Sequence, residues 1–203
     1  VFPRLTRITC YGGPISILRK SAEELAALRA SGLQMVYLGI ESGDDEVLKT
    51  NKKGVTADEM IAAGQKIISS GIKLSTMVIL GLGGQNRSDE HAVHTAQVIN
   101  AINPHFLSAL TLMLHPGSAL RADADKGKFQ PLSSYALLQE ARLLIENISV
   151  TKPCLFRSNH ISNILPLAGT LPNDKKALLE EIDIALKHRP NKQVPFFNDR
   201  GSF

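Results

Sequence analysis

The sequence predicts an α/β fold: a partial (β/α) barrel with parallel strands and about four to five strand–helix units. Apolar runs of strand length alternate with amphipathic stretches of helical length along most of the 203 residues. Such alternation is typical of parallel sheets with right-handed crossovers. Four or five units are too few to close an eight-stranded barrel. No linker composition divides the chain, which predicts one domain over 1–188 and an irregular tail over 189–203.

Five apolar runs, rich in β-branched residues and bounded by turn residues, are the expected strands. In chain order they cover 5–11, 35–40, 74–80, 106–114 and 149–156. The first ends in Gly-Gly-Pro, the third in a glycine-rich turn and the fourth in His-Pro-Gly-Ser. The run 35–40 is apolar throughout, as expected for a strand buried on both faces of a parallel sheet.

The intervening stretches carry helix-start and helix-stop signals. Residues 15–20 lead into the first expected helix, which runs from about 21 to 31, and the other expected helices cover about 56–71, 88–102, 135–148 and 174–188. Ser21 with Glu24, and Thr56 with Glu59, have the spacing of capping boxes. Gly71 stops the second helix.

Composition excludes several classes of protein. The net charge of +4 is modest and scattered, and there is no Trp, so no nucleic-acid-binding surface is indicated. The apolar runs are too short to cross a membrane, and residues 1–20 show no secretory signal, which predicts a cytoplasmic protein. Cys10 and Cys154 do not suggest a disulfide framework and are expected to be buried small hydrophobic residues.

The strand 35–40 is followed at once by Glu41 and Ser42. In α/β folds, ligands bind at the carboxyl ends of strands, so this carboxylate and hydroxyl are candidate binding groups. Lys52 and Lys53 follow one short helical segment later and could return to the same edge. The alternative is that Glu41 and Ser42 cap the next helix and that the lysines are solvated.

The turn at Gly81, with the sequence GLGGQN, lies between a buried strand and a helix N-terminus, where backbone N–H groups can approach an anion. It lacks the third glycine of a dinucleotide fingerprint and the Lys-Ser/Thr of a Walker motif. A tight structural turn is the equal alternative. His91 and His94 are one helical turn apart, but without an acidic third ligand they are expected on a solvated helix face.

A second polar cluster, RSNHISN, begins at Arg157 and includes Asn159 and His160. Apolar residues bracket it, which suggests a loop tucked into the fold. Arg can grip a carboxylate or phosphate and His can move protons, so these residues are candidate substrate contacts. A structural network is the alternative. No residue pattern identifies a catalytic nucleophile, and no cysteine pair has metal-ligand spacing.

The motifs GIES, GLGG and LMLHPGS at successive strand ends, with a leading CYGGP, resemble the second half of a radical S-adenosylmethionine (AdoMet) enzyme barrel. YLGIESGDDEVLKTNKKG is the most specific part. TLMLHPGSAL and FRSNHISNILPLAGTLP also resemble a bacterial Fe–S oxidoreductase subgroup.

The resemblance implies that AdoMet is the cofactor. It places Glu41, with Ser42 beside it, at the ribose or amino group of AdoMet and Lys53 at the methionine carboxylate. The remaining implied cofactor contacts border the nucleoside or leave room for it: Met77, Ile79, Gly81, Leu114 and His115.

The family's three-cysteine CxxxCxxC loop, which holds a [4Fe–4S] cluster, has no counterpart here. We therefore expect a fragment of a longer enzyme. The resemblance implies that the parent cleaves AdoMet to a 5′-deoxyadenosyl radical, which abstracts hydrogen from a small-molecule or otherwise unknown substrate. This chain alone should not cleave AdoMet. The exposed edge of the strand 5–11 is expected to be covered by another copy, by the C-terminal tail or by neighbouring molecules in a crystal.

Two other functions fit the residues. One is a different α/β-barrel enzyme that binds a phosphorylated small molecule at the Gly81 turn and uses Glu41 as acid or base. The other is a degenerate, non-catalytic binding module that has lost its cluster.

Overall fold

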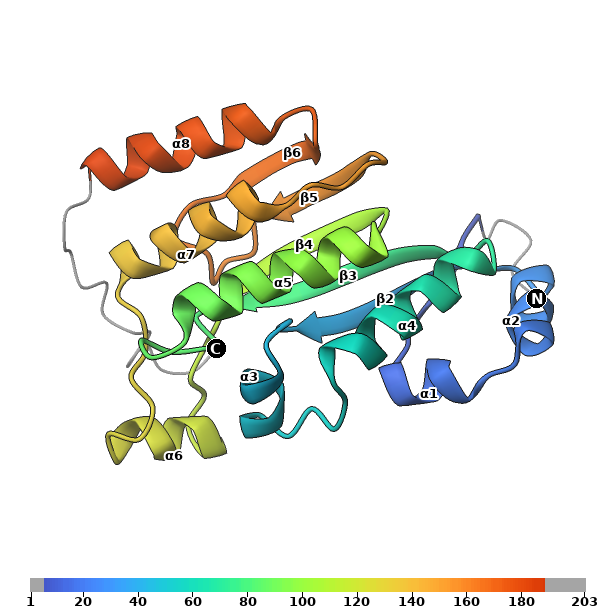
Figure 1. Ribbon diagram of the computed structural model, residues 1–203, viewed down its shortest axis with the longest axis horizontal. Coiled ribbons are helices and arrows are strands. Elements are labelled where there is room, and N and C mark those ends of the chain that lie inside the picture. The colour runs from blue at the N-terminus through green and yellow to red at the C-terminus, as the bar shows by residue number, and fades with distance from the viewer. Residues whose placement is uncertain (1–5, 189–203) are drawn as a thin grey trace.

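The computed structural model describes residues 6–188, which form a six-stranded sheet with helices packed against it (Figure 1). The strands are β1 (Ile8–Tyr11), β2 (Leu33–Glu41), β3 (Lys73–Leu80), β4 (Phe106–Thr111), β5 (Cys154–Ser158) and β6 (Leu167–Leu171). The helices are α1 (Pro14–Arg19), α2 (Ala22–Ala30), α3 (Asp45–Thr50), α4 (Ala57–Ser69), α5 (Ser88–Ile102), α6 (Ala119–Asp125), α7 (Ser134–Asn147) and α8 (Lys175–His188).

The strands lie side by side in chain order, and β1 to β5 run parallel. The predicted α/β fold with an open sheet of parallel strands is confirmed. β6 was not expected. It pairs antiparallel with β5 because the chain turns back after Ser158, which brings Leu167 opposite Ser158 and Leu171 opposite Cys154.

The helix expected from Ser21 to about 31 is confirmed as α2, whereas the residues that lead into it form a separate short helix, α1, which was not expected. Lys20 ends α1 in an extended conformation, with φ −73° and ψ 142°. Ser21 then starts α2, because its side chain accepts a hydrogen bond from the Glu24 N–H and the Glu24 carboxylate accepts one from the Ser21 N–H. The capping box itself was predicted correctly.

Two strand boundaries were wrong. The strand expected over 106–114 ends at Thr111, and the strand expected over 149–156 instead covers Cys154–Ser158. Arg157 therefore continues β5, where it pairs with Ser108 of β4. The alternation of buried and exposed residues along β5 explains why a charged side chain fits there.

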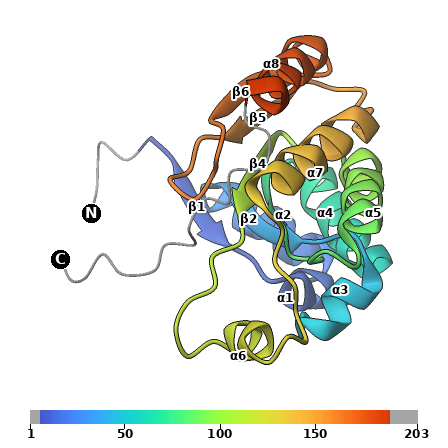
Figure 2. The ribbon, with the colours of Figure 1, turned by 90° about the vertical axis from the view of Figure 1, so that its left-hand side faces the viewer.

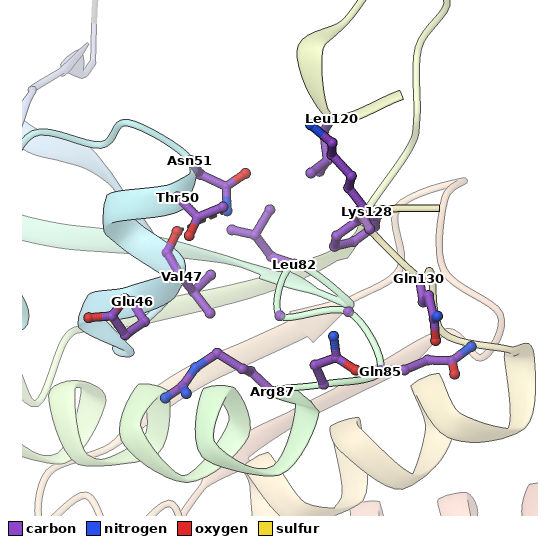
Figure 3. A pocket seen from close by; sticks show the side chains of 14 residues that line it. Glu46, Val47, Thr50, Asn51, Leu82, Gln85, Arg87, Leu120, Lys128 and Gln130 are labelled. Carbon is purple, nitrogen blue, oxygen red and sulfur yellow. Dashed lines mark hydrogen bonds between the residues drawn. The ribbon is translucent and has the colours of Figure 1, made fainter. Parts of the chain in front are cut away.

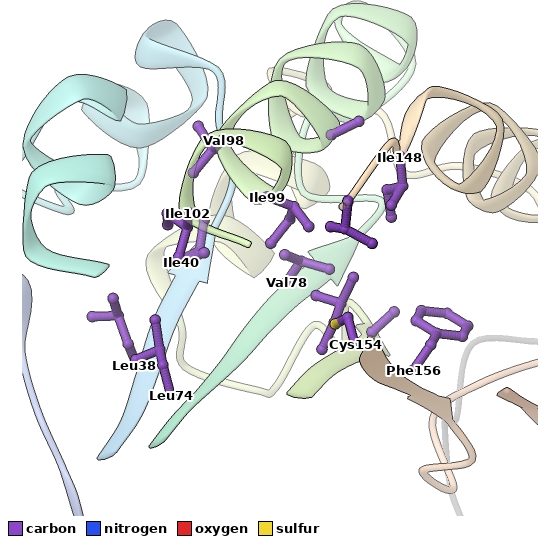
Figure 4. Close-up of a cluster of buried hydrophobic side chains, with 14 of the residues drawn as sticks. Leu38, Ile40, Leu74, Val78, Val98, Ile99, Ile102, Ile148, Cys154 and Phe156 are labelled. Atoms are coloured by element: carbon purple, nitrogen blue, oxygen red, sulfur yellow. The ribbon is translucent and has the colours of Figure 1, made fainter. Parts of the chain in front are cut away.

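One face of the sheet packs against the helices. Leu38 and Ile40 of β2 are fully buried, and Leu74 and Val78 of β3 lie on the same side. Figure 4 shows these side chains facing α5 across a continuous apolar core. Helices α4, α5, α7 and α8 lie in a row on this side, each against the next (Figures 1 and 2).

The opposite face, which we call the open face, carries the alternate residues of each strand. Tyr37, Gly39 and Glu41 of β2 and Met77 and Ile79 of β3 are half-buried there. Figure 2 shows the sheet edge-on, with this face turned away from the helix row. Candidate ligand groups at the carboxyl ends of β2 and β3 therefore meet on one surface.

Within residues 6–188, β1 pairs with β2 alone, and its other edge has no strand partner. The predicted cover by a second copy stays a prediction, and the tail over 189–203 lies outside the described residues. In the same part of the chain, no helix has the length and apolar character needed to cross a membrane.

Candidate functional site

Glu41 ends β2 in an unusual backbone conformation. Its φ is 65°, and the Ser42 N–H donates to the Ile40 carbonyl across it at 2.8 Å. A positive φ with an i to i+2 hydrogen bond defines a γ-turn, which is rare and strained. The pairing of β2 with β3 shifts at the same point, from Gly39 opposite Met77 to Glu41 opposite Val78. The γ-turn and the register shift of β2 thus both occur at Glu41, the residue that carries the candidate binding carboxylate.

Lys53 reaches this carboxylate, as the spacing suggested. Its Nζ lies 3.2 Å from Glu41 Oε1, and the two side chains are 24% and 27% exposed. The short helix α3 makes this possible: Lys52 has φ 54°, and the Lys53 N–H bonds back to the Leu48 carbonyl at 2.9 Å. A Cβ on Gly39 would collide with the Glu41 carboxylate, so glycine there leaves room for the pair.

The register places further predicted residues in the same row of the open face. Gly39 lies opposite Met77, Met77 opposite Ser108, and Ser108 opposite Arg157. Ile79 starts the next row toward the carboxyl edge, opposite Leu110. The structure therefore brings Met77, Ile79 and Arg157 onto the surface that holds Glu41.

Gly81 ends β3 with φ 85°, a conformation that favours glycine. Its N–H donates to Glu140 Oε1 at 2.6 Å. Leu114 and His115 lie beyond the end of β4 at Thr111, in the loop before α6. His115 is exposed, and its carbonyl accepts from the Ser118 hydroxyl at 2.8 Å.

The cluster that begins at Arg157 is less enclosed than expected. Asn159 and His160 are exposed in the turn between β5 and β6, and the Arg157 guanidinium donates to the Phe156 carbonyl at 2.7 Å. Two residues of this loop contact β4: Asn163 donates to the Ala109 carbonyl at 2.8 Å, and the Ser162 hydroxyl accepts from the Thr111 N–H at 3.2 Å. These contacts tie the loop to β4.

Ser42 does not face the open surface. It is fully buried and its Oγ lies 2.8 Å from His91 Nδ1. The expectation that His91 lies on a solvated helix face was wrong, because this side chain is only 2% exposed. Burial lowers the pKa of His91 to about 4. Its spacing from the buried Thr95, Val98 and Ile102 is that of one helix face, and this is the signal that could have identified it.

Glu140 of α7 was not identified from the sequence. It is 1% exposed and accepts hydrogen bonds from the Gly81 N–H and the Ser88 hydroxyl, each at 2.6 Å. Burial raises the pKa of Glu140 to about 7, against the opposing effect of the two hydrogen bonds. Its Oε1 lies 3.8 Å from His91 Nε2.

Asp44 lies near the buried pair of His91 and Glu140 and makes charged contacts of its own. Arg87 donates to both of its carboxylate oxygens, at 3.1 and 2.7 Å, and His94 Nδ1 lies 2.9 Å away. Burial disfavours the charged form, but the hydrogen bonds from Arg87, the Val47 N–H and His94 outweigh it and lower the pKa of Asp44 to about 2. Asp44 is thus an ionised cap of α3.

The two cysteines do not come together. Cys10 is exposed on β1, so the expectation of a buried residue was wrong, whereas Cys154 is buried on β5 as expected. Burial raises the pKa of Cys154 to about 12, which disfavours the thiolate that binds metals. Among residues 6–188, no group of three His, Cys, Asp or Glu side chains could hold a metal ion.

A cavity of about 160 Å³ lies at the carboxyl edge of the sheet, between α3, the Gly83–Arg87 turn and the chain that leads from α6 to α7 (Figure 3). Its lining combines carboxamide side chains, such as Asn51, Gln85 and Gln130, with Leu82 and Val47. Glu41 and Lys53 do not line it. The cavity is therefore separate from the Glu41–Lys53 pair.

Comparison with known proteins gives one family. Residues 5–96 match the model of the radical SAM superfamily. The tRNA uridine(34) acetyltransferase of Methanocaldococcus infernus is 24% identical over 163 residues, which are 80% of this chain and 30% of that protein.

Two solved structures share the fold. An archaeal Methanocaldococcus infernus Elp3 with an N-terminal deletion matches with a TM-score of 0.63 and 17% identity, over 88% of this chain and 42% of that one. Methylornithine synthase (PylB) matches with a TM-score of 0.51 and 15% identity, over 94% of this chain and 60% of that one. The chain thus spans less than two thirds of the proteins it matches.

The matched segment contains the parallel strands β1 to β3, the Glu41 turn and the Gly81 turn. The family model and the shared parallel α/β architecture agree on this part of the chain. Residues 5–96 are therefore similar to the radical SAM superfamily, and the rest of the chain shares the fold of the two solved structures.

Proposed function

We propose that this chain supplies the AdoMet-binding surface of a radical AdoMet enzyme, and that AdoMet lies on the open face at the ends of β2 and β3. The supporting observation is the Glu41–Lys53 pair, which joins a half-buried carboxylate and ammonium at 3.2 Å. The methionine end of AdoMet carries an ammonium and a carboxylate on one carbon atom. When AdoMet binds, the Glu41–Lys53 contact can be replaced by two charge-assisted contacts: Glu41 with the ammonium of AdoMet and Lys53 with its carboxylate.

Each side chain has a definite role in this proposal. Glu41 accepts hydrogen bonds from the ammonium or ribose hydroxyls of AdoMet, and Lys53 binds its carboxylate. Met77 and Ile79 offer apolar surface on the neighbouring strand, in register with β2 and β4. AdoMet supplies, on one-electron reduction, the group that abstracts a hydrogen atom from the substrate.

The residues of this chain do not fit the iron–sulfur cluster. Such clusters are held by several cysteine thiolates, and the sequence has two cysteines, one on β1 and one buried on β5. We therefore propose that cluster ligands come from polypeptide outside this sequence. The chain alone should bind AdoMet without cleaving it.

The contacts of the Gly81 turn disfavour the alternative of a phosphate site there. The N–H groups of Gly81, Leu82, Gly84 and Gln85 donate to Glu140, Ile79, Gly81 and Gln130 respectively. A phosphate cradle needs such N–H groups to be available. The AdoMet proposal uses side chains instead.

Calorimetric titration with S-adenosylhomocysteine tests the proposal. Lys53→Met should weaken binding at least tenfold, since a charge-assisted hydrogen bond contributes about 1.5–3 kcal/mol. Lys52→Met is the matched control: it removes the same charge one residue earlier, from an exposed side chain, and should change the affinity less than twofold.

Binding of a sugar phosphate in place of S-adenosylhomocysteine, or equal losses in the two lysine variants, would refute the proposed function. Formation of 5′-deoxyadenosine by this chain after anaerobic reconstitution with iron and sulfide would refute the claim that it cannot cleave AdoMet.

A further inference from the structure

The Glu41 turn needs support from its surroundings. A non-glycine residue in a sparsely populated backbone region costs about 1–3 kcal/mol and persists only where neighbouring contacts fix it. The i to i+2 hydrogen bond from the Ser42 N–H to the Ile40 carbonyl offsets part of this cost. The residues that follow Glu41 are one source of the remaining stabilisation, beside the Lys53 contact and the pairing with β3.

Ser42 is the first of these residues. Its Oγ accepts from the Asp44 N–H at 3.0 Å and contacts His91 Nδ1 at 2.8 Å. His91 Nε2 lies 3.0 Å from the Ile79 carbonyl, and a carbonyl can only accept. His91 therefore carries a proton on Nε2. Burial lowers its pKa to about 4, so the ring is neutral at pH 7 and its Nδ1 accepts from the Ser42 hydroxyl.

These contacts join two neighbouring strand ends through one side chain of α5. Ser42 follows β2, and Ile79 lies near the end of β3. Glu140, 3.8 Å from His91 Nε2, holds the Gly81 N–H and so fixes the end of β3 from α7. His91 is thus buried between the residues that follow β2 and the end of β3.

The set Ser42, His91 and Glu140 has the residue types of a hydrolase triad, but its contacts exclude that role. Ser42 is fully buried, so its hydroxyl cannot reach a substrate. His91 Nε2 donates to the Ile79 carbonyl, and both Glu140 oxygens accept from Gly81 and Ser88. Nothing in this arrangement is directed at a ligand.

We propose that His91 is a positioning residue that acts through Ser42: it holds the Glu41 turn in its left-handed conformation and thereby fixes the Glu41 carboxylate on the open face beside Lys53. The identity of the ligand bound by Glu41 rests on the proposed function. The effect of His91 on the turn does not.

Two variants at position 91 separate positioning from mere packing. His91→Leu introduces an apolar side chain of similar bulk, which removes the acceptor for the Ser42 hydroxyl proton and the imidazole donor to the Ile79 carbonyl. The contacts of these groups with the Asp44 and Leu82 N–H groups remain. The carboxamide of His91→Gln again supplies one acceptor, its oxygen, and one donor, its nitrogen, both bonded to the same carbon atom. Asn100→Ala is the matched control on the same helix, because it removes hydrogen bonds to Asn147 and Ser149 away from the turn.

Amide hydrogen exchange reads the turn without any ligand. In His91→Leu, the Ser42 N–H should exchange at least tenfold faster, whereas the Leu107 N–H in the core of β4 should change less than threefold. His91→Gln should restore most of the protection, and Asn100→Ala should not expose Ser42 selectively. An equal acceleration at Ser42 and Leu107, or no acceleration at either, would overturn the proposal.

If His91→Leu does not fold, Ser42→Ala tests the same link by removing one hydroxyl, with the same selective acceleration expected at position 42. Titration with S-adenosylhomocysteine is the second measurement, and His91→Leu should weaken binding about tenfold while His91→Gln stays within about threefold. Failure of the wild-type chain to bind would defeat the proposed function, and the exchange data would still decide the role of His91.

Discussion

Replacing Glu140 with Gln tests whether burial keeps this carboxyl group protonated to a higher pH in the folded protein than in the unfolded chain. Burial raises its pKa from 4.5 to about 7, whereas the unfolded chain keeps the ordinary value. The folded state therefore binds more protons between these two values, so Glu140 stabilises the fold at low pH and this stabilisation is lost as the pH rises through about 7. The carboxamide introduced by Glu140→Gln cannot ionise, and its oxygen can still accept from the Gly81 N–H.

The magnitude follows from linkage. One pKa unit corresponds to about 1.4 kcal/mol, so a shift of about 2.5 units gives about 2.5 kcal/mol between about pH 5 and about pH 8.5. On going from the higher to the lower pH, the free energy of unfolding of the wild type should rise by about this amount relative to that of Glu140→Gln. Other titrating groups largely cancel because they are present in both proteins.

Urea denaturation followed by far-ultraviolet circular dichroism provides the assay, since the sequence has no Trp for fluorescence. Glu180→Gln is the control: this carboxylate lies on α8 with its side chain 62% exposed, so its difference between the two pH values should stay below about 0.5 kcal/mol. A difference equally small for Glu140→Gln would show that Glu140 is ionised and hydrated, and would refute the reasoning.

Two further predictions concern Gly43 and Asp44, which lie in the loop between β2 and α3. Gly43→Ala should lower the free energy of unfolding by about 1–3 kcal/mol, because a Cβ there would collide with the backbone of His94 and Thr95. Gly13→Ala is the control in the same urea assay, because the nearest heavy atom to a Cβ at that position is 4.0 Å away. Equal effects of the two substitutions would contradict this account. Asp44→Asn should cost about 2 kcal/mol at neutral pH, since the pKa of Asp44 is lowered from 3.8 to about 2. That stabilisation is present above 3.8 and is lost as the pH falls through about 2, so the two proteins should converge in acid unfolding, and a constant difference would argue against an ionised Asp44.

Much of the fold was predictable because local signals agree with the packing. The capping boxes at Ser21 and Thr56 start helices in the structure, and the apolar strand before Glu41 lies inside a parallel sheet as expected. The short helix α1 was not predicted, because no side chain caps its start and its residues were interpreted only as the segment that leads into α2.

The site was predictable only in part, for a different reason. Glu41 and Lys53 are close in sequence, so their meeting depends on one short helix, whose length limits where the lysine can go. Glu140 is far from Gly81 in the sequence, and only the packing of α7 against α5 brings it there. A buried carboxylate that binds a backbone N–H leaves no local pattern.

His91 and Glu140 also have opposite effects on stability, which bears on how the site tolerates acid. Burial lowers the pKa of His91 from 6.5 to about 4, so its contribution is lost as the pH falls through this range. The contribution of Glu140 to the free energy of unfolding increases as the pH falls over almost the same range, because burial raises its pKa from 4.5 to about 7. The two effects nearly cancel in the wild type, so the buried support of the Glu41 and Gly81 turns should hold steadily between about pH 5 and pH 7. Glu140→Gln removes one side of this balance, and its free energy of unfolding should then fall by about 2 kcal/mol on acidification to about pH 5, through His91 alone.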